Sequence, residues 1–474
     1  CLKAARLGKP VVAFKIGRSE AGVQAAVSHT GAMAGANRMY DALFKQVGVI
    51  RAQTFADLLD IPAALATGRR LRGQRVAVLT STGGAGTLVS DDLGVAGFET
   101  PAPDPVTASA LRALQTGSEA VLDRNPIDVT LAGLRPDLLR GAIRVLLDSP
   151  SYDALVVIVG SSALAMPELM AHAIRDCLPG TDKPVLAYVS PHAPEVAAVL
   201  TRNGVPAYAA AESCTAALKG LRHTAAFQTP TTAMARTTQP TAPTGLDTLP
   251  SGTLDEAQAK QLFARFGVPC APEQVVSTPA QAVAAAQALG GRVVLKMLSS
   301  HITHKSDVGG VAVGLTPDTI APRLAQMAGD VHGKTGWRPE RYLVQQMVAG
   351  GTELVLGMHR DALGTAVLLG MGGVTAELFQ DTTLRLLPQG PQGLEALSPE
   401  DALAMAQELR TWPLLNGFRG RPLADVPALV QAVVAFSRMA AQLGDTLVEA
   451  EINPLFVGAL GDGVCAADGV VVMA

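Results

Sequence analysis

Short apolar runs alternate with helical periods from residue 9 to residue 227, and this alternation constrains the fold more than any other sequence feature. Clear apolar runs occupy 75–80 (RVAVLT), 154–159 (ALVVIV) and 184–189 (PVLAYV). Runs this short and this uniformly apolar suit strands that are covered on both faces, as in a parallel sheet with helical connections. The pattern therefore predicts an α/β protein.

Composition divides the chain into four regions. Residues 1–70 contain a strand run at 11–16, helical periods and a short β run, which amounts to only part of a doubly wound domain. Residues 71–228 are predicted to form a second α/β unit. Residues 229–250 are rich in Thr, Pro and Ala without apolar periodicity, which is typical of an interdomain linker. Residues 251–474 form the last region.

The last region opens with a helix, LDEAQAKQLFARFG, that ends at Gly267 and Pro269, because glycine caps helices and proline cannot continue them. Strand runs follow at 293–297, 310–315, 342–347, 353–358 and 365–370, with a final one at 470–473. The region is therefore also predicted to be α/β.

Charge and cysteine content argue against several functions. The net charge is −3 without a basic block, which favours a small soluble substrate over nucleic acid or a membrane surface. The five cysteines lack CxxC or Cys/His ligand spacing, which indicates a reducing compartment with neither a disulfide framework nor a zinc site. No run reaches the roughly 18 apolar residues of a membrane span. The start shows no signal-peptide pattern and no initiator Met, so we expect a cytoplasmic protein and the middle of a longer one.

His29 lies in a run of small residues, SHTGAMAG at 28–35. An imidazole in such a loop is accessible and is a competent nucleophile near neutral pH. Those properties suit a group that attacks one phosphate and hands it to a distant acceptor. From composition alone, a surface histidine in a turn is the simpler interpretation.

A glycine-rich turn, STGGAGT, follows the run at 75–80 and precedes a helix. Gly83, Gly84 and Gly86 would let the free N–H groups of the helix N-terminus approach a phosphate. The spacing is not that of a P-loop and no lysine follows, which argues against nucleotide binding here. Many strand-to-helix turns are glycine-rich for steric reasons alone. The neighbouring NPID at 125–128 is explained equally well as a simple Asx or proline turn.

The last region carries a second set of polar candidates. Lys296 lies within an apolar strand run, where a cation needs a partner. A polar loop with two glycines follows at 301–310 and could fold over phosphates. Candidates for an adenine and ribose edge are predicted on a strand pair: Gln346, Met347, Val348 and Glu353. Hard oxygen donors of the kind that Mg²⁺ prefers come last: Glu451, Asn453 and Asp468. In this order they indicate a nucleotide site.

Residues 251–474 resemble an ATP-grasp domain of acyl-CoA and succinyl-CoA synthetases, since VVLKM, HKSDVGGV, LVQQMV with GTEL, MGGVTAEL and EINP stand in that family's order. The resemblance implies that Lys296 binds nucleotide phosphates and that residues 346–348 frame the adenine near Glu353. It assigns Mg²⁺ to Glu451, Asn453 and Asp468. It also makes His304 the second histidine of the ADP-forming branch, which receives phosphate beside the nucleotide, and leaves His301 as structural.

Residues 1–225 resemble the flavodoxin-type succinyl-CoA-ligase-like domains of the same family, the first of them incomplete. SHTGAMAG matches the phosphohistidine loop, with His29 as the shuttle. STGGAGT matches one of two helix N-termini that stabilise the phosphohistidine, and NPID matches its neighbour. Single-chain relatives begin with a CoA-binding domain and a complete first ligase domain. We therefore expect a fragment, a truncated product, or a chain completed by another polypeptide.

The resemblance implies an acid–thiol ligase: carboxylic acid + CoA + ATP ⇌ acyl-CoA + ADP + phosphate through a phosphohistidine. ATP/ADP and Mg²⁺ would bind this chain, CoA would be a substrate, and the assembly would be a homo-oligomer or be completed by a CoA-binding polypeptide. The alternatives are a non-catalytic nucleotide-binding fragment and a regulatory relative of synthetase-like protein acyltransferases. The presence of His29 argues against the regulatory relative. The carboxylic acid, the choice of ADP over GDP, the direction of reaction and the activity of this chain alone stay open.

Overall fold

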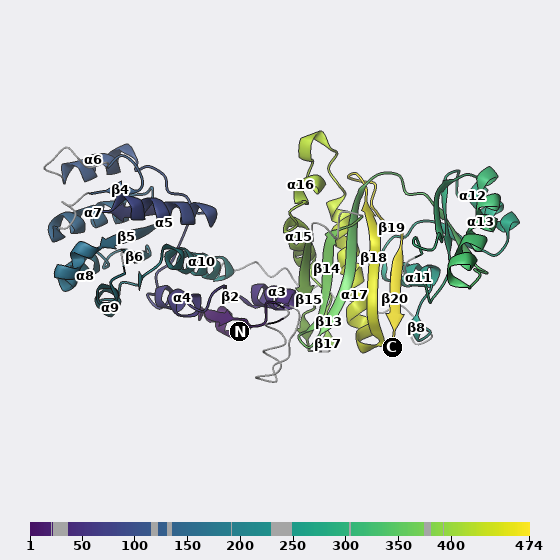
Figure 1. Ribbon diagram of the computed structural model, residues 1–474, viewed down its shortest axis with the longest axis horizontal. Coiled ribbons are helices and arrows are strands. Elements are labelled where there is room, and N and C mark those ends of the chain that lie inside the picture. Colours follow the sequence, from purple (N-terminus) through teal and green to yellow (C-terminus); the bar gives the residue numbers. More distant parts are fainter. Residues whose placement is uncertain are drawn as a thin grey trace. The chain divides into compact units, whose positions relative to one another are not determined.

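The computed structural model describes residues 1–19, 21, 37–114, 122–129, 135–190, 192–228, 249–302, 305–373, 381–391 and 393–474. The chain forms two compact units, each of mixed helices and strands (Figure 1). Unit 1 comprises Cys1–Ala26 and Phe44–Arg236, and unit 2 comprises Val27–Leu43 and Thr237–Ala474. The α/β fold class is as the sequence predicted, whereas the boundary between regions 1–70 and 71–228 stays a prediction.

Unit 1 is built around a parallel sheet with strand order β4-β3-β5-β6-β7. Its strands are β3 (Val76–Thr80), β4 (Ile127–Asp128), β5 (Ala154–Gly160), β6 (Val185–Ser190) and β7 (Ala207–Tyr208). Its helices are α4 (Asp57–Leu65), α5 (Gly83–Val95), α6 (Pro105–Ala113), α7 (Pro136–Asp148), η2 (Ser161–Ala165), α8 (Pro167–Arg175), α9 (Pro194–Arg202) and α10 (Ala211–Gln228). Helices separate these strands in the chain because parallel neighbours need a crossover connection.

The strands of this sheet are buried on both faces. On β5, Leu155 and Val157 pack with α6, α7, α8 and α9, whereas Val156 and Ile158 pack with α4, α5 and α10. Because side chains alternate along a strand, each strand contributes to two cores at once. This double coverage explains why the runs read as continuously apolar.

The amino-terminal part forms a smaller parallel pair, in which Val11 lies opposite Val49. Its elements are α1 (Leu2–Arg6), β1 (Val11–Phe14), α3 (Asn37–Val47) and β2 (Val49–Ala52). The residues of α3 up to Leu43 belong to unit 2, where Met39 is buried with Leu384 and Leu386.

The described part of unit 2 contains two large antiparallel sheets and one short antiparallel pair. The first has the order β11-β10-β12-β9, and α12 and α13 cover one of its faces. Its elements are β9 (Glu273–Val276), α12 (Pro279–Ala288), β10 (Val293–Met297), β11 (Val311–Leu315), α13 (Pro317–Thr335) and β12 (Tyr342–Gln346). The second has the order β15-β14-β13-β18-β20-β8, with β19 paired to β18.

The second sheet and its helices make up the rest of unit 2. The strands are β8 (Gly252–Thr253), β13 (Thr352–Asp361), β14 (Gly364–Met371), β15 (Thr382–Leu386), β18 (Leu447–Val457), β19 (Val464–Ala466) and β20 (Gly469–Met473), beside a short pair of β16 (Gln389–Gly390) and β17 (Gly393–Leu394). The helices are α11 (Glu256–Phe266), α15 (Pro399–Gln407), α16 (Trp412–Leu415), η4 (Phe418–Gly420), α17 (Val426–Leu443) and η5 (Gly444–Thr446). The helix at the start of this region ends at Gly267, as predicted, in a left-handed conformation.

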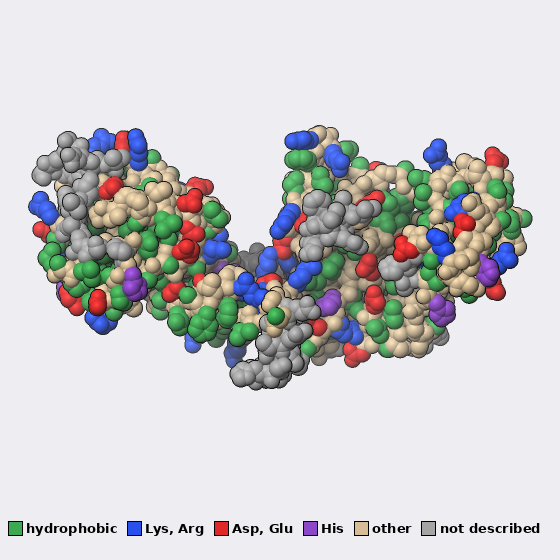
Figure 2. Space-filling model, viewed as in Figure 1, with side chains coloured by type: hydrophobic (Ala, Val, Ile, Leu, Met, Phe, Trp, Pro, Cys, Tyr) green, Lys and Arg blue, Asp and Glu red, His purple; other side chains and the backbone are tan. Residues whose placement is uncertain are grey.

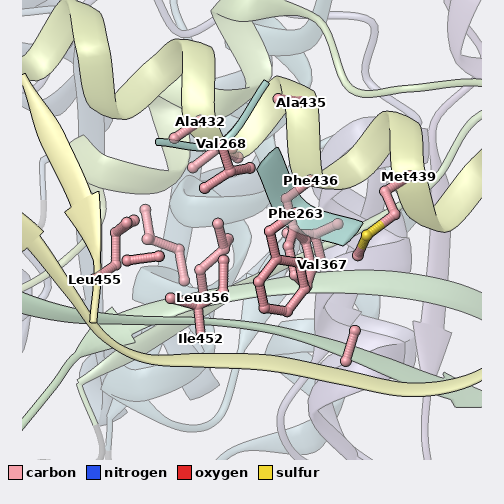
Figure 3. Close-up of a cluster of buried hydrophobic side chains, with 14 of the residues drawn as sticks. Phe263, Val268, Leu356, Val367, Ala432, Ala435, Phe436, Met439, Ile452 and Leu455 are labelled. Carbon is pink, nitrogen blue, oxygen red and sulfur yellow. The ribbon is translucent and has the colours of Figure 1, made fainter. Parts of the chain in front are cut away.

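The core of unit 2 lies between the second sheet and α11, α15 and α17. Phe263 of α11 and Phe436 of α17 meet at a centroid distance of 6.0 Å, above Leu356 and Ile452 of the sheet (Figure 3). These aromatic side chains are fully buried, and truncating such residues typically costs about 3–5 kcal/mol. The core therefore fixes α11, which also carries the buried charged residues Glu256 and Lys260, against the sheet.

One described helical segment, Val426–Thr446, is long and apolar enough to cross a membrane by length and composition alone. Half of its most apolar window is buried within unit 2. Leu429, Val433 and Phe436 pack into the core described above, so burial in a protein core accounts for its apolar character.

Candidate active site

Unit 2 buries a cluster of charged side chains beside α11. The helix begins at Glu256 because Asp255 accepts from the Gln258 backbone N–H while the Gln258 side chain accepts from the Asp255 N–H. Glu256 and Lys260 lie one turn apart, on one side of the helix. Both are at most 2% exposed, which is rare for charged residues unless they are paired.

Lys296 is buried in β10 and meets the cluster with its ammonium group. Its Nζ donates to Glu256 Oε1 at 2.6 Å and to the Ala467 carbonyl at 2.8 Å, and it lies 3.4 Å from Asp468 Oδ2. The sequence predicted that this lysine needs a partner, and the structure supplies Glu256. The whole set of contacts lies within residues 251–474.

Two further lysines contact the same carboxylate. Lys260 Nζ donates to Glu256 Oε1 at 2.9 Å and to Gln345 Oε1 at 2.6 Å, and it also pairs with Glu273. Lys305 donates to Glu256 Oε2 and lies 3.5 Å from Asp468 Oδ1. Glu256 therefore holds Lys260, Lys296 and Lys305 together.

Ion pairing outweighs burial in setting the pKa values of Glu256 and Lys305. Burial by itself raises the pKa of a carboxyl and lowers that of an ammonium group. Against burial, the surrounding lysines, Lys296 foremost, hold the pKa of Glu256 well below its usual range. Similarly, Glu256 and Asp468 raise the pKa of Lys305 despite its burial. At neutral pH Glu256 is therefore a carboxylate and Lys305 an ammonium group. The ammonium group suits a site for an anionic ligand.

The predicted adenine-edge residues lie near this cluster in the chain, but not on a strand pair. Gln346 ends β12 in the first sheet, whereas Glu353 belongs to β13 in the second. The sequence-based expectation of a strand pair is therefore wrong, because β12 pairs with β10 and β9 instead. Met347 and Val348 lie in the segment that connects the two sheets, and Met347 is 40% exposed. The roles of these residues at an adenine stay predictions.

The predicted Mg²⁺ ligands come together only in part. Glu451 and Asn453 lie on one face of β18, and the Asn453 amide donates to Glu451 Oε1 at 3.2 Å. Asp468 instead faces Lys296 and Lys305. In the described part of the chain, no group of three or more His, Cys, Asp or Glu residues is arranged to hold a metal ion. The Glu451–Asn453 pair still offers the hard oxygen donors that suit Mg²⁺.

Comparison with known proteins decides the family. Residues 248–473 match the model of the ATP-grasp domain, and residues 1–65 match that of the succinyl-CoA ligase like flavodoxin domain. Over 208 residues the chain is 31% identical to the acetate–CoA ligase [ADP-forming] I subunit beta of Pyrococcus furiosus, covering 43% of this chain and 85% of that protein. The chain belongs to the ADP-forming acetate–CoA ligase family. The flavodoxin-type domain followed by an ATP-grasp domain is therefore the family architecture that the sequence predicted.

Longer relatives of the ADP-forming ligase family align with nearly the whole chain. This chain is 31% identical over 482 residues to a trans-feruloyl-CoA synthase of an unknown prokaryotic organism, and the alignment covers 98% of this chain and 65% of that protein. It is 27% identical over 457 residues to the acetate–CoA ligase [ADP-forming] I of Archaeoglobus fulgidus, covering 95% of this chain and 64% of that protein. The chain thus spans about two thirds of the length of these curated ligases.

The glycine turn of this ligase-family chain lies in unit 1, at the carboxyl edge of the parallel sheet. Gly83, Gly84 and Gly86 form the first turn of α5 rather than a loop before it. A Cβ at Gly86 would lie 3.0 Å from Pro126 Cβ, whereas a Cβ at Gly84 would meet no atom within 4 Å. Gly86 is thus explained by packing. The exposed Gly83 and Gly84 keep the helix N-terminus open to an anion.

The two candidate phosphate-carrying histidines, His29 and His304, lie outside the described residues, so their roles stay predictions. Glu256, Lys260 and Lys305 were not predicted as site residues from the sequence. A signal for the first two was available, because Glu256 and Lys260 are spaced four apart in a helix predicted to pack on a core. Lys305 stands directly after His304 in the ADP-forming ligases' HKSDVGGV segment, but no role had been given to it.

Proposed function

We propose that this chain carries the phosphoryl-transfer machinery of an ADP-forming acyl-CoA synthetase: carboxylic acid + CoA + ATP ⇌ acyl-CoA + ADP + phosphate. The observation that carries the proposal is the buried cluster of Lys260, Lys296 and Lys305 around Glu256, inside a domain of the ATP-grasp family. Buried ammonium groups that are already aligned favour a polyanionic ligand, since they need no reorganisation when it arrives. Nucleotide phosphates have that charge.

In this proposal each half of the chain has its own task. Lys296 neutralises nucleotide phosphates, while Gln346, Met347 and Val348 contact the base beside Glu353. Phosphoryl transfer depends mainly on positioning and on charge neutralisation. His304 and then His29 would take the phosphoryl group, with the first turn of α5 stabilising the phosphohistidine. In the synthesis direction His29 delivers it to the acid at the CoA site, where an acyl phosphate precedes acyl-CoA.

Glu451 and Asn453 fit the role of Mg²⁺ ligands, because their side chains lie within hydrogen-bond distance of each other on one strand face. Asp468 would join them. When bound, Mg²⁺ would lower the negative charge of the nucleotide phosphates. The protein's own contribution is to supply the lysines and these oxygen donors from one domain.

CoA and acyl recognition are proposed to lie largely outside this chain, in the third of the relatives' length that it does not cover. Relatives include ligases divided into alpha and beta subunits. We propose that a CoA-binding polypeptide or homo-oligomerisation completes the enzyme. On the face shown in Figure 2, acidic and basic side chains are interspersed, in keeping with a small-molecule substrate. We propose that the enzyme is cytoplasmic.

Because the relatives are ligases along almost the whole chain, the synthetase is favoured over a regulatory or non-catalytic fragment. The test is to incubate the chain with γ-labelled ATP and Mg²⁺ and to assay acid-labile, base-stable protein phosphate. His304→Ala is expected to prevent labelling, because the first acceptor is lost, and His29→Ala is expected to restrict the label to His304. His332→Ala, at an exposed position of α13, is the control and should keep the label. Full labelling of both test variants would overturn the phosphohistidine assignment.

A further inference from the structure

The charged cluster of unit 2 is closed at one end and open at the other. The Lys260 side chain is 1% exposed, and its ammonium group has acceptors in Glu256, Gln345 and the Ala467 carbonyl. The Lys296 side chain is 7% exposed, that of Lys305 11%, and that of Asp468 31%. Lys260 is therefore fully engaged within the protein, whereas Lys296 and Lys305 face the open end.

Glu256 joins the two ends of this cluster. Its side chain is fully enclosed, with Oε1 shared by Lys260 and Lys296 and Oε2 bound to Lys305. Glu256 lies in the first turn of α11, where the capping box of Asp255 and Gln258 fixes the start of the helix and the helix dipole favours a carboxylate. A rigid planar anion thus keeps two ammonium groups next to each other in a region where like charges would otherwise repel strongly.

We infer that Glu256 is a positioning residue of the nucleotide site: its carboxylate holds the ammonium groups of Lys296 and Lys305 side by side, so that both contact the phosphate chain together. The inference rests on the proposed function, because it takes the nucleotide to bind beside Lys296. It adds Lys305 as a second phosphate-binding cation. Lys260 serves as the buried counterion that anchors Glu256 itself.

An opposite role for Glu256 would be to compete with phosphate for these lysines. Its burial argues against competition, because a side chain that is fully enclosed and bound to Lys260 does not reach an open ligand site. Removing its charge would leave Lys296 and Lys305 repelling each other, with the partly exposed Asp468 carboxylate, at 3.4 Å and 3.5 Å, as the weaker contact that they share. A positioning role for Glu256 therefore predicts weaker phosphate binding when its charge is removed, whereas a competing role predicts tighter binding.

The test compares Glu256→Gln with wild type by calorimetric titration of the full chain, with the β,γ-methylene analogue of ATP plus Mg²⁺ and with AMP. We expect the affinity for the triphosphate to fall roughly tenfold or more and that for AMP to change much less. The triphosphate-to-AMP affinity ratio is therefore the readout. Glu256→Asp keeps the charge and is expected to restore part of the ratio.

The control is Asp425→Asn, which neutralises another buried carboxylate of unit 2. Asp425 caps α17 and accepts from the Ala428, Gly461 and Gly463 backbone N–H groups, with no lysine among those contacts. General destabilisation of unit 2 would affect this control as well. A change in the ratio that appears only at Glu256 therefore reports on phosphate positioning.

A folded Glu256→Gln chain with an unchanged or increased ratio would overturn the inference. If circular dichroism finds that variant unfolded, Glu256→Asp decides, because its shorter side chain must lower the ratio below that of wild type. The methylene analogue cannot donate its phosphoryl group, so binding is separated from transfer. If wild type takes label on His29 but Glu256→Gln leaves the affinity ratio unchanged, only this inference is refuted. If Glu256→Gln lowers the ratio but wild type takes no label, only the phosphohistidine proposal is refuted.

Discussion

Lys296 Nζ donates a 2.6 Å hydrogen bond to the carboxylate of Glu256, which lies forty residues earlier in the chain. One residue belongs to β10 and the other to the first turn of α11, and both are almost inaccessible to solvent. A buried pair of this kind contributes little net stability, but removing one partner leaves the other charge unpaired. Its presence is therefore better explained by a role in ligand binding than by stability.

Replacing Lys296 by Met is expected to weaken ATP binding about tenfold or more, because a charge-assisted contact to phosphate is lost. Glu256 keeps Lys260 and Lys305 as partners, so the variant should fold. Calorimetric titration with ATP and Mg²⁺ measures the effect. Lys183→Met is the matched control, because Lys183 donates to the Ser149 carbonyl in unit 1. Wild-type affinity in Lys296→Met would exclude this lysine from the site.

Two glycines in the first turn of α5 are expected to respond differently to alanine. A Cβ at Gly86 would approach Pro126 Cβ to 3.0 Å and Thr80 Cγ2 to 3.1 Å, whereas one at Gly84 meets no atom within 4 Å. Overpacking should outweigh the helix-propensity gain in Gly86→Ala, for a net loss of about 1 kcal/mol. Gly84→Ala should be neutral or stabilising. Urea unfolding of both variants checks this, and equal effects would contradict the packing explanation.

Unit 1 should lose stability in acid partly through Asp104. Thr107 donates to it from both hydroxyl and backbone, at 2.6 and 3.0 Å, and Ser151 adds a bond of 2.8 Å. The Thr107 hydroxyl foremost holds the pKa of Asp104 well below its usual range. The carboxylate therefore stabilises the folded state above its unfolded pKa of about 3.9, and this contribution disappears as the pH falls through the lowered folded value.

Asp104→Asn should accordingly lower the urea midpoint of unit 1 at pH 7 and lower it less and less below about pH 4. The transition is followed by far-ultraviolet circular dichroism. Asp137→Asn is the control, since the Asp137 side chain is 92% exposed and pairs with Arg140 at the surface; its effect should be small at every pH. A midpoint difference for Asp104→Asn that does not shrink in acid would refute the linkage.

The fold class and the order of motifs were predictable from the sequence because strand runs such as Ala154–Gly160 are buried on both faces and so are continuously apolar. Which strands pair with each other was harder to predict from the sequence. Gln346 and Glu353 were expected on one strand pair but belong to separate sheets, since periodicity identifies a strand but not its neighbour. The apolar strand around Lys296 was enough to predict that this lysine has a partner. That the partner is Glu256 could not be predicted, because the contact depends on how α11 packs against the sheet.

The last prediction concerns Glu451 and Asn453, whose side chains meet at 3.2 Å on β18. If they hold Mg²⁺, Glu451→Gln should raise the free Mg²⁺ concentration that half-maximally enhances ATP binding, by roughly tenfold, because an anionic oxygen ligand is lost. In EDTA, wild type and variant should bind ATP alike. Calorimetric titrations over a series of free Mg²⁺ concentrations measure this.

Glu449→Gln is the matched control, because Glu449 is an exposed carboxylate two residues earlier on the same strand. It removes the same charge from the same region without removing a proposed ligand, so its Mg²⁺ dependence should stay that of wild type. Equal shifts in both variants would indicate a general electrostatic effect. An unshifted Glu451→Gln would instead place the metal ligands elsewhere, and Asp468, which faces Lys296 and Lys305, would then act on the lysines alone.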